Sequence, residues 1–395
     1  MQLLVYKSDM AWPRRSGHDV HTFEMMRCWA ASGHAVHLAT AIPPLKRAIE
    51  GIGIKSMTCL REYARSQRSS PIANKGLARR YARYWGIPDA DIRSVGQIAS
   101  EISADAVIAS GLDSLPLLSS VSKSIRIWYA ADEWLWHHLS LMHWRDLSTW
   151  RELKIGLVKG LYEWSHRGLL DRIWVVSETD KRAMRMVSGV QNVDIISNGV
   201  DVEYFKPYQT GNEKPCSAIF WGRLDFDPNI QALNWFSTNV WPLLSKNHPQ
   251  ALFTIIGAHP DKRVLKLESK PGILVLGDVD DLRPLAARHQ LVVLPFVSGG
   301  GIKNKLLEAA ALGKPIVCSP VGAGGLRGSP PLCVCRTPAE WLTTIESIWE
   351  QPDQRNALGS AARDWVCLEH TWAQSAQAAL KTIIASRVKL TPGLN

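Results

Sequence analysis

The stretch that decides the fold is LPFVSGGGIKNKLLEAAALGKPIV, residues 294–317. A buried strand ends near Pro295, three glycines follow at positions 299–301, and a helical segment then runs until Gly313. A strand, a glycine loop, a helix and a second apolar run in this order indicate a βαβ unit with a parallel sheet. The glycines allow positive φ angles and a close approach of the backbone to a ligand.

The start of this helix is a predicted anion site. Unpaired N–H groups and the helix dipole favour negative charge there. Lys303 and Lys305 stand near the first turn, where cations are unfavourable unless an anionic ligand binds. Glu308 shares a face with Lys305, and its carboxylate could accept ribose or sugar hydroxyls. An ordinary surface ion pair between the two is the alternative interpretation.

Outward from this unit, apolar runs alternate with helical segments along the whole chain. A first series has strands predicted at 2–6, 35–40, 106–109, 125–129 and 173–176, and a second has strands at 218–220, 252–256, 273–276, 291–294 and 316–318. Two series predict two tandem doubly wound α/β domains, Rossmann-like in type, with a ligand-binding cleft between them. We expect domains at 1–200 and 201–370, and a final helix, 371–395, that could pack back on the first domain.

Composition excludes several classes of protein. With 395 residues, 46% of them hydrophobic and 21% charged, the chain is neither disordered, collagen-like nor a coiled coil. Seven irregularly spaced cysteines fit no zinc or disulfide pattern, and we expect a reducing, cytoplasmic setting. No signal peptide or membrane-spanning stretch is evident, so a soluble or peripheral protein is expected.

Charge and tryptophan are concentrated in the first half. The net charge is +10, and residues 46–93 hold 11 Lys or Arg against 4 Asp or Glu. Ten of the 17 tryptophans precede residue 175. Basic and aromatic side chains together suit an anionic membrane surface, here the inner face of a membrane. Solvated charge and core packing of the rings are the alternatives, and no recognised nucleic-acid-binding module is present.

At this point the sequence resembles a known family. GGGIKNKLLEAAALGKPIVCSPVGAGGL, residues 299–326, resembles the nucleotide-sugar motif of glycosyltransferase family four, glycosyl transferases group 1, which have the GT-B fold. VVSETDKRAMRM (175–186), IISNGVDVEYFKP (195–207) and FWGRLDFDPNIQALNWFSTNVWPLL (220–244) agree with it in order. The resemblance covers nearly the whole chain and is loose over 43–105. It implies an acceptor-side first domain and a second domain that binds a nucleotide sugar.

The resemblance also implies roles for residues of the second domain. Arg223 matches an arginine that neutralises the diphosphate, but the lysine usual five residues later is Pro228 here. We hypothesise that Lys305 supplies that charge instead, with Lys303 beside it. Many members carry two glutamates eight positions apart. Only Glu308 is present here, because Gly300 occupies the first position.

Further donor-binding residues implied by the family motif are Gly17, Gly299, Gly301 and Asn304, and Asp132 is implied as catalytic. His18, His137 and His138 lie near such positions without matching the motif. Asp225-Phe226-Asp227 has the form of a metal-binding D-x-D, but we expect a turn and helix cap there.

The implied reaction moves a sugar from a nucleotide diphosphate sugar to a hydroxyl of a glycan or lipid-linked acceptor, in polysaccharide or glycoconjugate biosynthesis. It proceeds with retention, without metal and without a cofactor. A non-catalytic nucleotide-sugar or polyanion-binding protein, or a phosphorylase or epimerase of the same fold, is the alternative.

Overall fold

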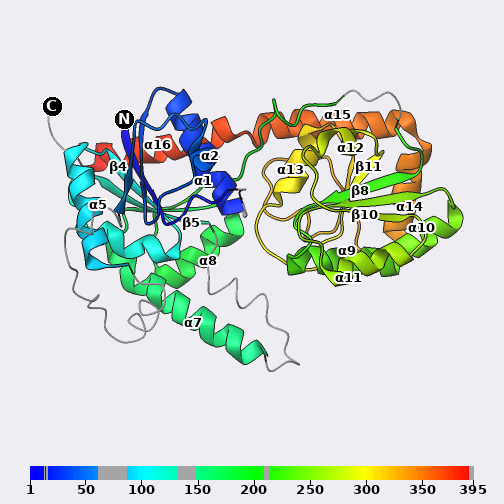
Figure 1. The fold of residues 1–395 in the computed structure, drawn as a ribbon, viewed down its shortest axis with the longest axis horizontal. Coiled ribbons are helices and arrows are strands. Elements are labelled where there is room, and N and C mark those ends of the chain that lie inside the picture. Colours follow the sequence, from blue (N-terminus) through cyan, green and yellow to red (C-terminus); the bar gives the residue numbers. More distant parts are fainter. Residues whose placement is uncertain (13, 15–16, 61–86, 132–147, 209–212, 391–395) are drawn as a thin grey trace. The chain divides into compact units, whose positions relative to one another are not determined.

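The computed structural model describes the chain except residues 13, 15–16, 61–86, 132–147, 209–212 and 391–395. Its internal contacts divide it into two compact units (Figure 1). Unit 1 consists of Met1–Ser197 and Trp372–Asn395, and unit 2 of Asn198–Thr371. Each unit is a parallel sheet with helices packed on it, and each is described by itself below.

The sheet of unit 1 has the strand order β3-β2-β1-β4-β5-β6-β7, and every pairing is parallel. Its strands are β1 (Gln2–Lys7), β2 (Ala35–Thr40), β3 (Ser56–Cys59), β4 (Ala106–Ser110), β5 (Ile125–Ala131), β6 (Arg172–Val175) and β7 (Val193–Ile195). The central strand β4 is buried at every position, as expected where helices cover both faces of a parallel sheet.

The helices of unit 1 cover this sheet, and the last described helix of the chain, α16, is one of them. They are α1 (Gly17–Ala31), α2 (Lys46–Ile49), α5 (Asp89–Glu101), η1 (Leu112–Ser120), α7 (Ser148–His166), η2 (Arg167–Leu169), α8 (Glu178–Ser188) and α16 (Trp372–Leu390). Two buried indoles fix α16 in place. Trp29 Nε1 donates to the Ala376 carbonyl at 3.1 Å, and Trp174 Nε1 donates to Thr382 Oγ1 at 3.0 Å.

Unit 2 has the strand order β10-β9-β8-β11-β12-β13, again all parallel. Its strands are β8 (Ser217–Trp221), β9 (Leu252–Ile256), β10 (Ile273–Leu276), β11 (Leu291–Leu294), β12 (Ile316–Cys318) and β13 (Cys333–Val334). Its helices are α9 (Asp227–Asn239), α10 (Trp241–Asn247), α11 (Lys262–Leu265), η3 (Lys266–Ser269), α12 (Arg283–Ala287), α13 (Asn304–Ala311), α14 (Pro338–Glu350) and α15 (Pro352–Glu369). The core contains an aromatic cluster, in which Phe236 contacts the rings of Trp241, Phe253 and Trp341.

The two sheets confirm the predicted class of tandem doubly wound α/β domains. In each sheet the strand order reverses at one place, between β1 and β4 in unit 1 and between β8 and β11 in unit 2. Ligands of such sheets bind beyond the carboxyl ends of the strands at this reversal. Among the described helices, none combines the length and the hydrophobicity needed to cross a bilayer.

Candidate functional site

The predicted site of unit 2 is built where β8 and β11 end side by side. The two strands pair in parallel, with Ala218 opposite Leu291 and Ile219 opposite Val292. After β8 the chain turns at Gly222, whose φ is 141°, and after β11 it enters the glycine loop that leads into α13. Because the carboxyl ends of parallel strands share one edge, the turn, the loop and the start of α13 lie together there.

The glycine loop uses its glycines unequally. Gly299 and Gly301 have φ angles of 97° and 66°, which side chains with a Cβ rarely adopt. Gly300 has no such angle, and a Cβ built on it would meet nothing within 4 Å. Lys303 Nζ donates to the carbonyl of Gly299, at 3.0 Å, and to that of Gly300. This lysine, which was predicted to add positive charge for an anionic ligand, therefore holds the glycine loop through two hydrogen bonds.

Lys305 points from α13 toward the end of β8. Its Nζ donates to Asn229 Oδ1 at 2.8 Å and lies 4.3 Å from the centre of the Phe220 ring and 5.2 Å from that of Phe296. A Cβ at Gly222 would lie 2.5 Å from this amine, at a position whose φ of 141° already favours glycine. An amide oxygen and two aromatic faces therefore hold the ammonium group.

The surroundings shift the pKa of Lys305 and Glu308 in opposite directions. Burial of the amine lowers the pKa of Lys305 to about 7. The negative charge of Glu308 acts to raise this pKa, and the positive charge of Lys303 lowers it by a smaller amount. Burial raises the pKa of Glu308, although Trp221 Nε1 donates to its Oε2 at 2.7 Å. Both residues keep part of their surface exposed. Their hydrogen bonds go to different partners.

Asn229 connects the two halves of the site, and sequence reasoning did not identify it. Its Nδ2 donates to the Arg223 carbonyl at 2.6 Å, while its Oδ1 accepts from Lys305. It follows Pro228, which stands in the first turn of α9 where the family usually has a lysine nearby. The missing lysine in the motif is the signal that could have directed attention to this position.

Arg223 lies exposed on the turn after β8 and forms a two-point ion pair with Asp225. The Nε–Oδ1 and Nη2–Oδ2 distances are both 2.9 Å, and the hydrogen bond to Asp225 raises the pKa of Arg223. Such exposed pairs contribute about 0–1 kcal/mol, so the guanidinium can exchange its partner for a phosphate at little cost.

The D-x-D sequence is engaged by arginines on both sides. Asp227 Oδ1 accepts from Arg263 at 3.1 Å, and Asp225 is held by Arg223. The N-cap position of α9 is occupied by Phe226, and no side chain caps the helix. The prediction that this sequence caps the helix is therefore wrong. Within the described parts of the chain, no group of three His, Cys, Asp or Glu side chains could hold a metal ion.

Asn304 anchors the start of α13. It is the first residue of the helix, and its Oδ1 accepts from Asn198 Nδ2 at 2.8 Å. Asn198 stands in the Ser-Asn-Gly turn at the start of unit 2. The structure thus brings together the predicted residues of unit 2, and Asn304 contacts the side chain of Asn198 in this turn.

Two of the predicted residues of unit 1, Gly17 and His18, are described by the structure and lie at the start of α1. Gly17 is the first residue of α1 and is exposed. The next residue, His18, pairs through Nε2 with Ser110 Oγ at 2.9 Å. Burial, with nearby Lys7, lowers the pKa of His18 to about 3, so the imidazole is neutral at pH 7. Asp132, His137 and His138 lie outside the residues that the structure describes.

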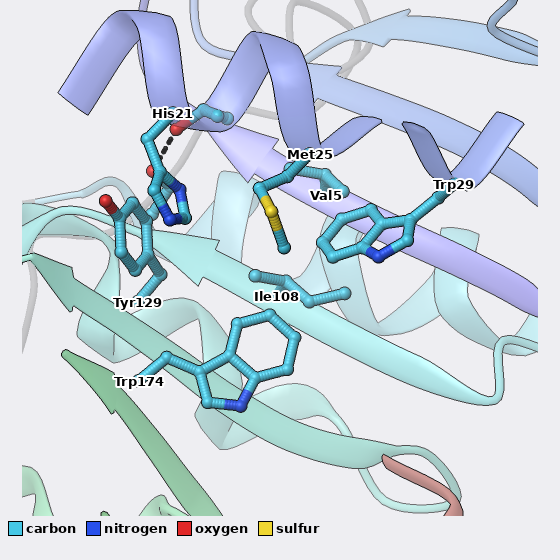
Figure 2. A pocket seen from close by; sticks show the side chains of 9 residues that line it. Val5, His21, Met25, Trp29, Ile108, Tyr129 and Trp174 are labelled. Carbon is cyan, nitrogen blue, oxygen red and sulfur yellow. Dashed lines mark hydrogen bonds between the residues drawn. The ribbon is translucent and has the colours of Figure 1, made fainter. Parts of the chain in front are cut away.

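A small pocket lies farther along α1 in unit 1, between that helix and the sheet (Figure 2). Its wall is mostly apolar, and His21 stacks on Tyr129 with ring centres 4.4 Å apart. His21 Nε2 meets the Ile196 carbonyl at 3.2 Å, and burial lowers the pKa of His21 to about 4. A neutral, ring-stacked histidine is suited to packing α1 on the sheet.

Known proteins are similar to the part of the chain that holds this site. Residues 215–351 match the family model of glycosyl transferases group 1, and the match contains Arg223, the glycine loop, Lys305 and Glu308. The chain is 24% identical over 243 residues to glycogen synthase from Mycobacterium tuberculosis. That alignment covers 54% of this chain and 56% of the relative, so the chain spans about half the length of the curated relative.

Solved structures are similar over nearly the full length. HepE from Anabaena, solved with UDP and glucose, is 15% identical with a TM-score of 0.65, covering 97% of this chain and 99% of HepE. Sucrose-phosphate synthase from Thermosynechococcus elongatus is 13% identical with a TM-score of 0.69, covering 99% and 100% of the two chains. This likeness shows the fold: two Rossmann-like domains in tandem, the GT-B arrangement.

Proposed function

We propose that this chain is a glycosyltransferase of family four that moves a sugar from a nucleotide diphosphate sugar to a hydroxyl of a glycan or lipid-linked acceptor. The observation that carries the proposal is the meeting of an arginine, a glycine loop, a partly buried amine and a carboxylate at one edge of the unit 2 sheet. The match to glycosyl transferases group 1 over this unit supports it, as does the UDP complex of HepE.

In this proposal Arg223 and Lys305 bind the diphosphate. Negative charge grows on the leaving phosphate as the bond to the sugar breaks, and preorganised cations and N–H groups stabilise it. The N–H groups of the glycine loop and of the start of α13 add to this field. The amine of Lys305 needs no large movement, because Asn229 and the two phenylalanine rings already fix it.

Glu308 is proposed to bind the ribose. Trp221 occupies Oε2, which leaves Oε1 to accept a hydroxyl hydrogen bond. The indole also fixes the carboxylate in place. Gly300 stands where many members have the first of their two glutamates, and without that side chain the loop leaves open space for the sugar.

We further propose a retaining reaction without metal. The bond between the anomeric carbon and the phosphate oxygen breaks, the bond to the acceptor oxygen forms on the same face, and the acceptor proton passes to the leaving phosphate. No strong protein base is needed in such a step. His18, whose lowered pKa keeps it neutral, is suited to hydrogen bonding and not to holding positive charge. Gly17 and Asp132 remain predicted contributors from unit 1.

A ligand screen tests the proposal. UDP-, GDP-, ADP- and dTDP-sugars are added to the full chain, and the melting temperature is measured. A donor at one hundred times its Kd stabilises by about 2.7 kcal/mol, or roughly 5–10 °C for a domain of this size. Transfer to an acceptor, or hydrolysis, is then followed by mass spectrometry of the products.

Two variants make the test specific. Lys305→Ala should abolish the thermal shift and turnover, whereas Lys246→Ala, at an exposed lysine of α10, should leave both unchanged. Unchanged turnover in Lys305→Ala would contradict the assignment of the site. Binding of a donor without transfer or hydrolysis would favour the non-catalytic alternative.

A further inference from the structure

An exposed apolar stripe runs along α7 of unit 1. Trp150, Leu157, Leu161 and Trp164 are 71%, 46%, 41% and 49% exposed. They follow one another at intervals of seven, four and three residues, which places them on one face of the helix. Soluble proteins rarely expose two tryptophans and two leucines on one face. Contiguous exposed apolar patches of this kind mark binding surfaces.

In the part of unit 1 that the structure describes, this stripe is not used for packing. The opposite side of α7 is the one that packs on unit 1, and its buried residues include Gly156, Gly160, Tyr162 and His166. Figure 1 shows the first turns of α7 extending beyond the other described elements of unit 1. The apolar stripe therefore faces away from the body of the unit that holds the helix.

The exposed charge on this face is positive. Lys154 lies within the stripe, four residues after Trp150 and three before Leu157. Arg167, just after the helix, stacks its guanidinium 3.8 Å from the centre of the Trp164 ring. Glu163 carries the carboxylate among the side chains of α7 that the structure describes, and it is buried. Among its described side chains, the face thus combines apolar, aromatic and cationic groups without an exposed acid.

We propose that this face of α7 docks on an anionic lipid bilayer. Tryptophan rings settle at the interface between head groups and acyl chains, leucines bury just beneath it, and lysine and arginine keep their charges among the lipid phosphates. Anionic head groups attract such cations, and the net charge of +10 acts in the same direction. Docking does not depend on the proposed transferase activity. It would bring unit 1 to an acceptor anchored in the membrane.

Co-sedimentation with vesicles tests the proposal on the full chain. Phosphatidylcholine vesicles with and without 30% phosphatidylglycerol are compared at about 0.1 M salt, where charge attraction is only partly screened. We expect the wild type to pellet with the anionic vesicles, to bind neutral ones several-fold less, and to be released as salt rises.

Three variants locate the contact. The triple variant Trp150→Ser, Leu157→Ser, Trp164→Ser should reduce binding at least tenfold. A matched triple variant at exposed apolar residues of unit 2, Tyr208→Ser, Leu243→Ser, Leu265→Ser, should bind like the wild type. Lys154→Glu should reduce binding to anionic vesicles and leave the weak neutral binding unchanged, and this single surface change keeps the test informative if the triple variant folds poorly.

The proposal would be overturned if the wild type stayed in the supernatant, bound neutral and anionic vesicles equally, or kept its binding in the α7 triple variant. It would also be overturned if light scattering showed a dimer that the α7 triple variant converts to a monomer while vesicle binding is unchanged, because the stripe would then join two copies. The thermal shift with a sugar nucleotide should persist in the α7 triple variant, so failure of docking and failure of the proposed activity are distinguishable.

Discussion

The amine of Lys305 makes the stability of the protein depend on pH. Folding lowers its pKa from 10.5 to about 7. Between these values the unfolded chain binds more protons than the folded chain, so the free energy of unfolding rises with pH in that window. Below pH 7 both states carry the charge, and the contribution of Lys305 becomes constant.

The size of the effect follows from the same pKa. The whole difference between 10.5 and about 7 corresponds to about 5 kcal/mol of disfavoured charge. Lys305→Met removes the titrating group and keeps an unbranched chain over the Phe220 ring. Relative to this variant, the wild type should gain about 2 kcal/mol of unfolding free energy between pH 7 and pH 9. Glu308 acts in the same direction, because loss of the neighbouring cation raises its pKa further in the variant.

The assay is urea unfolding of both proteins at pH 6, 7, 8 and 9, with the difference in unfolding free energy plotted against pH. The difference should be flat up to about pH 7 and then rise. Lys246→Met is the matched control, because it makes the same substitution at an exposed lysine of α10 outside the site. Parallel wild-type and Lys305→Met profiles from pH 7 to 9 would refute the assignment of a desolvated amine.

Two further predictions concern the same site. At pH 8 an amine with a pKa of about 7 is roughly one-tenth protonated, so binding of UDP should draw about one proton from the buffer. Titration calorimetry in Tris and in phosphate measures this uptake, and a binding enthalpy independent of the buffer in the wild type would contradict it. Asn229→Ala removes the partner of the Lys305 amine and of the Arg223 carbonyl, and should cost about 1–3 kcal/mol of unfolding free energy and weaken donor binding. Urea unfolding checks the first effect against Asn239→Ala, an exposed position later in α9 where a change within about 0.5 kcal/mol is expected, and an equal cost at both positions would argue against the bridging role of Asn229.

The glycine loop and its flanking strand and helix could be predicted because their determinants are local. Glycines with positive φ, a strand of apolar residues and the residues at the helix start all lie within about twenty positions. The partners of the site were not predictable in the same way. Asn229 and Trp221 are 76 and 87 residues before Lys305 and Glu308, and they reach them because β8 pairs with β11 and not with a strand close in sequence.

Other differences have physical reasons of their own. The strands β3 and β13 lie at sheet edges and have four and two residues, too few for a clear pattern of hydrophobic residues. The helix α16 packs on unit 1 because Trp29 and Trp174 of that unit donate hydrogen bonds to it. These tryptophans lie 347 and 208 residues from their partners in α16. The ion pair of Arg223 and Asp225, by contrast, spans two residues, so sequence reasoning could have reached it, although it was not predicted.

The position of Lys305 and the departure from the family motif at Pro228 are linked through one residue. A proline in the first turn of α9 suits the helix but brings no charge, and the next residue, Asn229, turns its amide oxygen to the amine that α13 supplies. That amine lies against the turn after β8, where Gly222 has a φ of 141° and carries no side chain. The positive charge proposed for the diphosphate thus reaches this edge of the sheet from α13. Its cost is the desolvation that lowers the pKa of Lys305, and a bound anion would offset that cost by restoring the charged form.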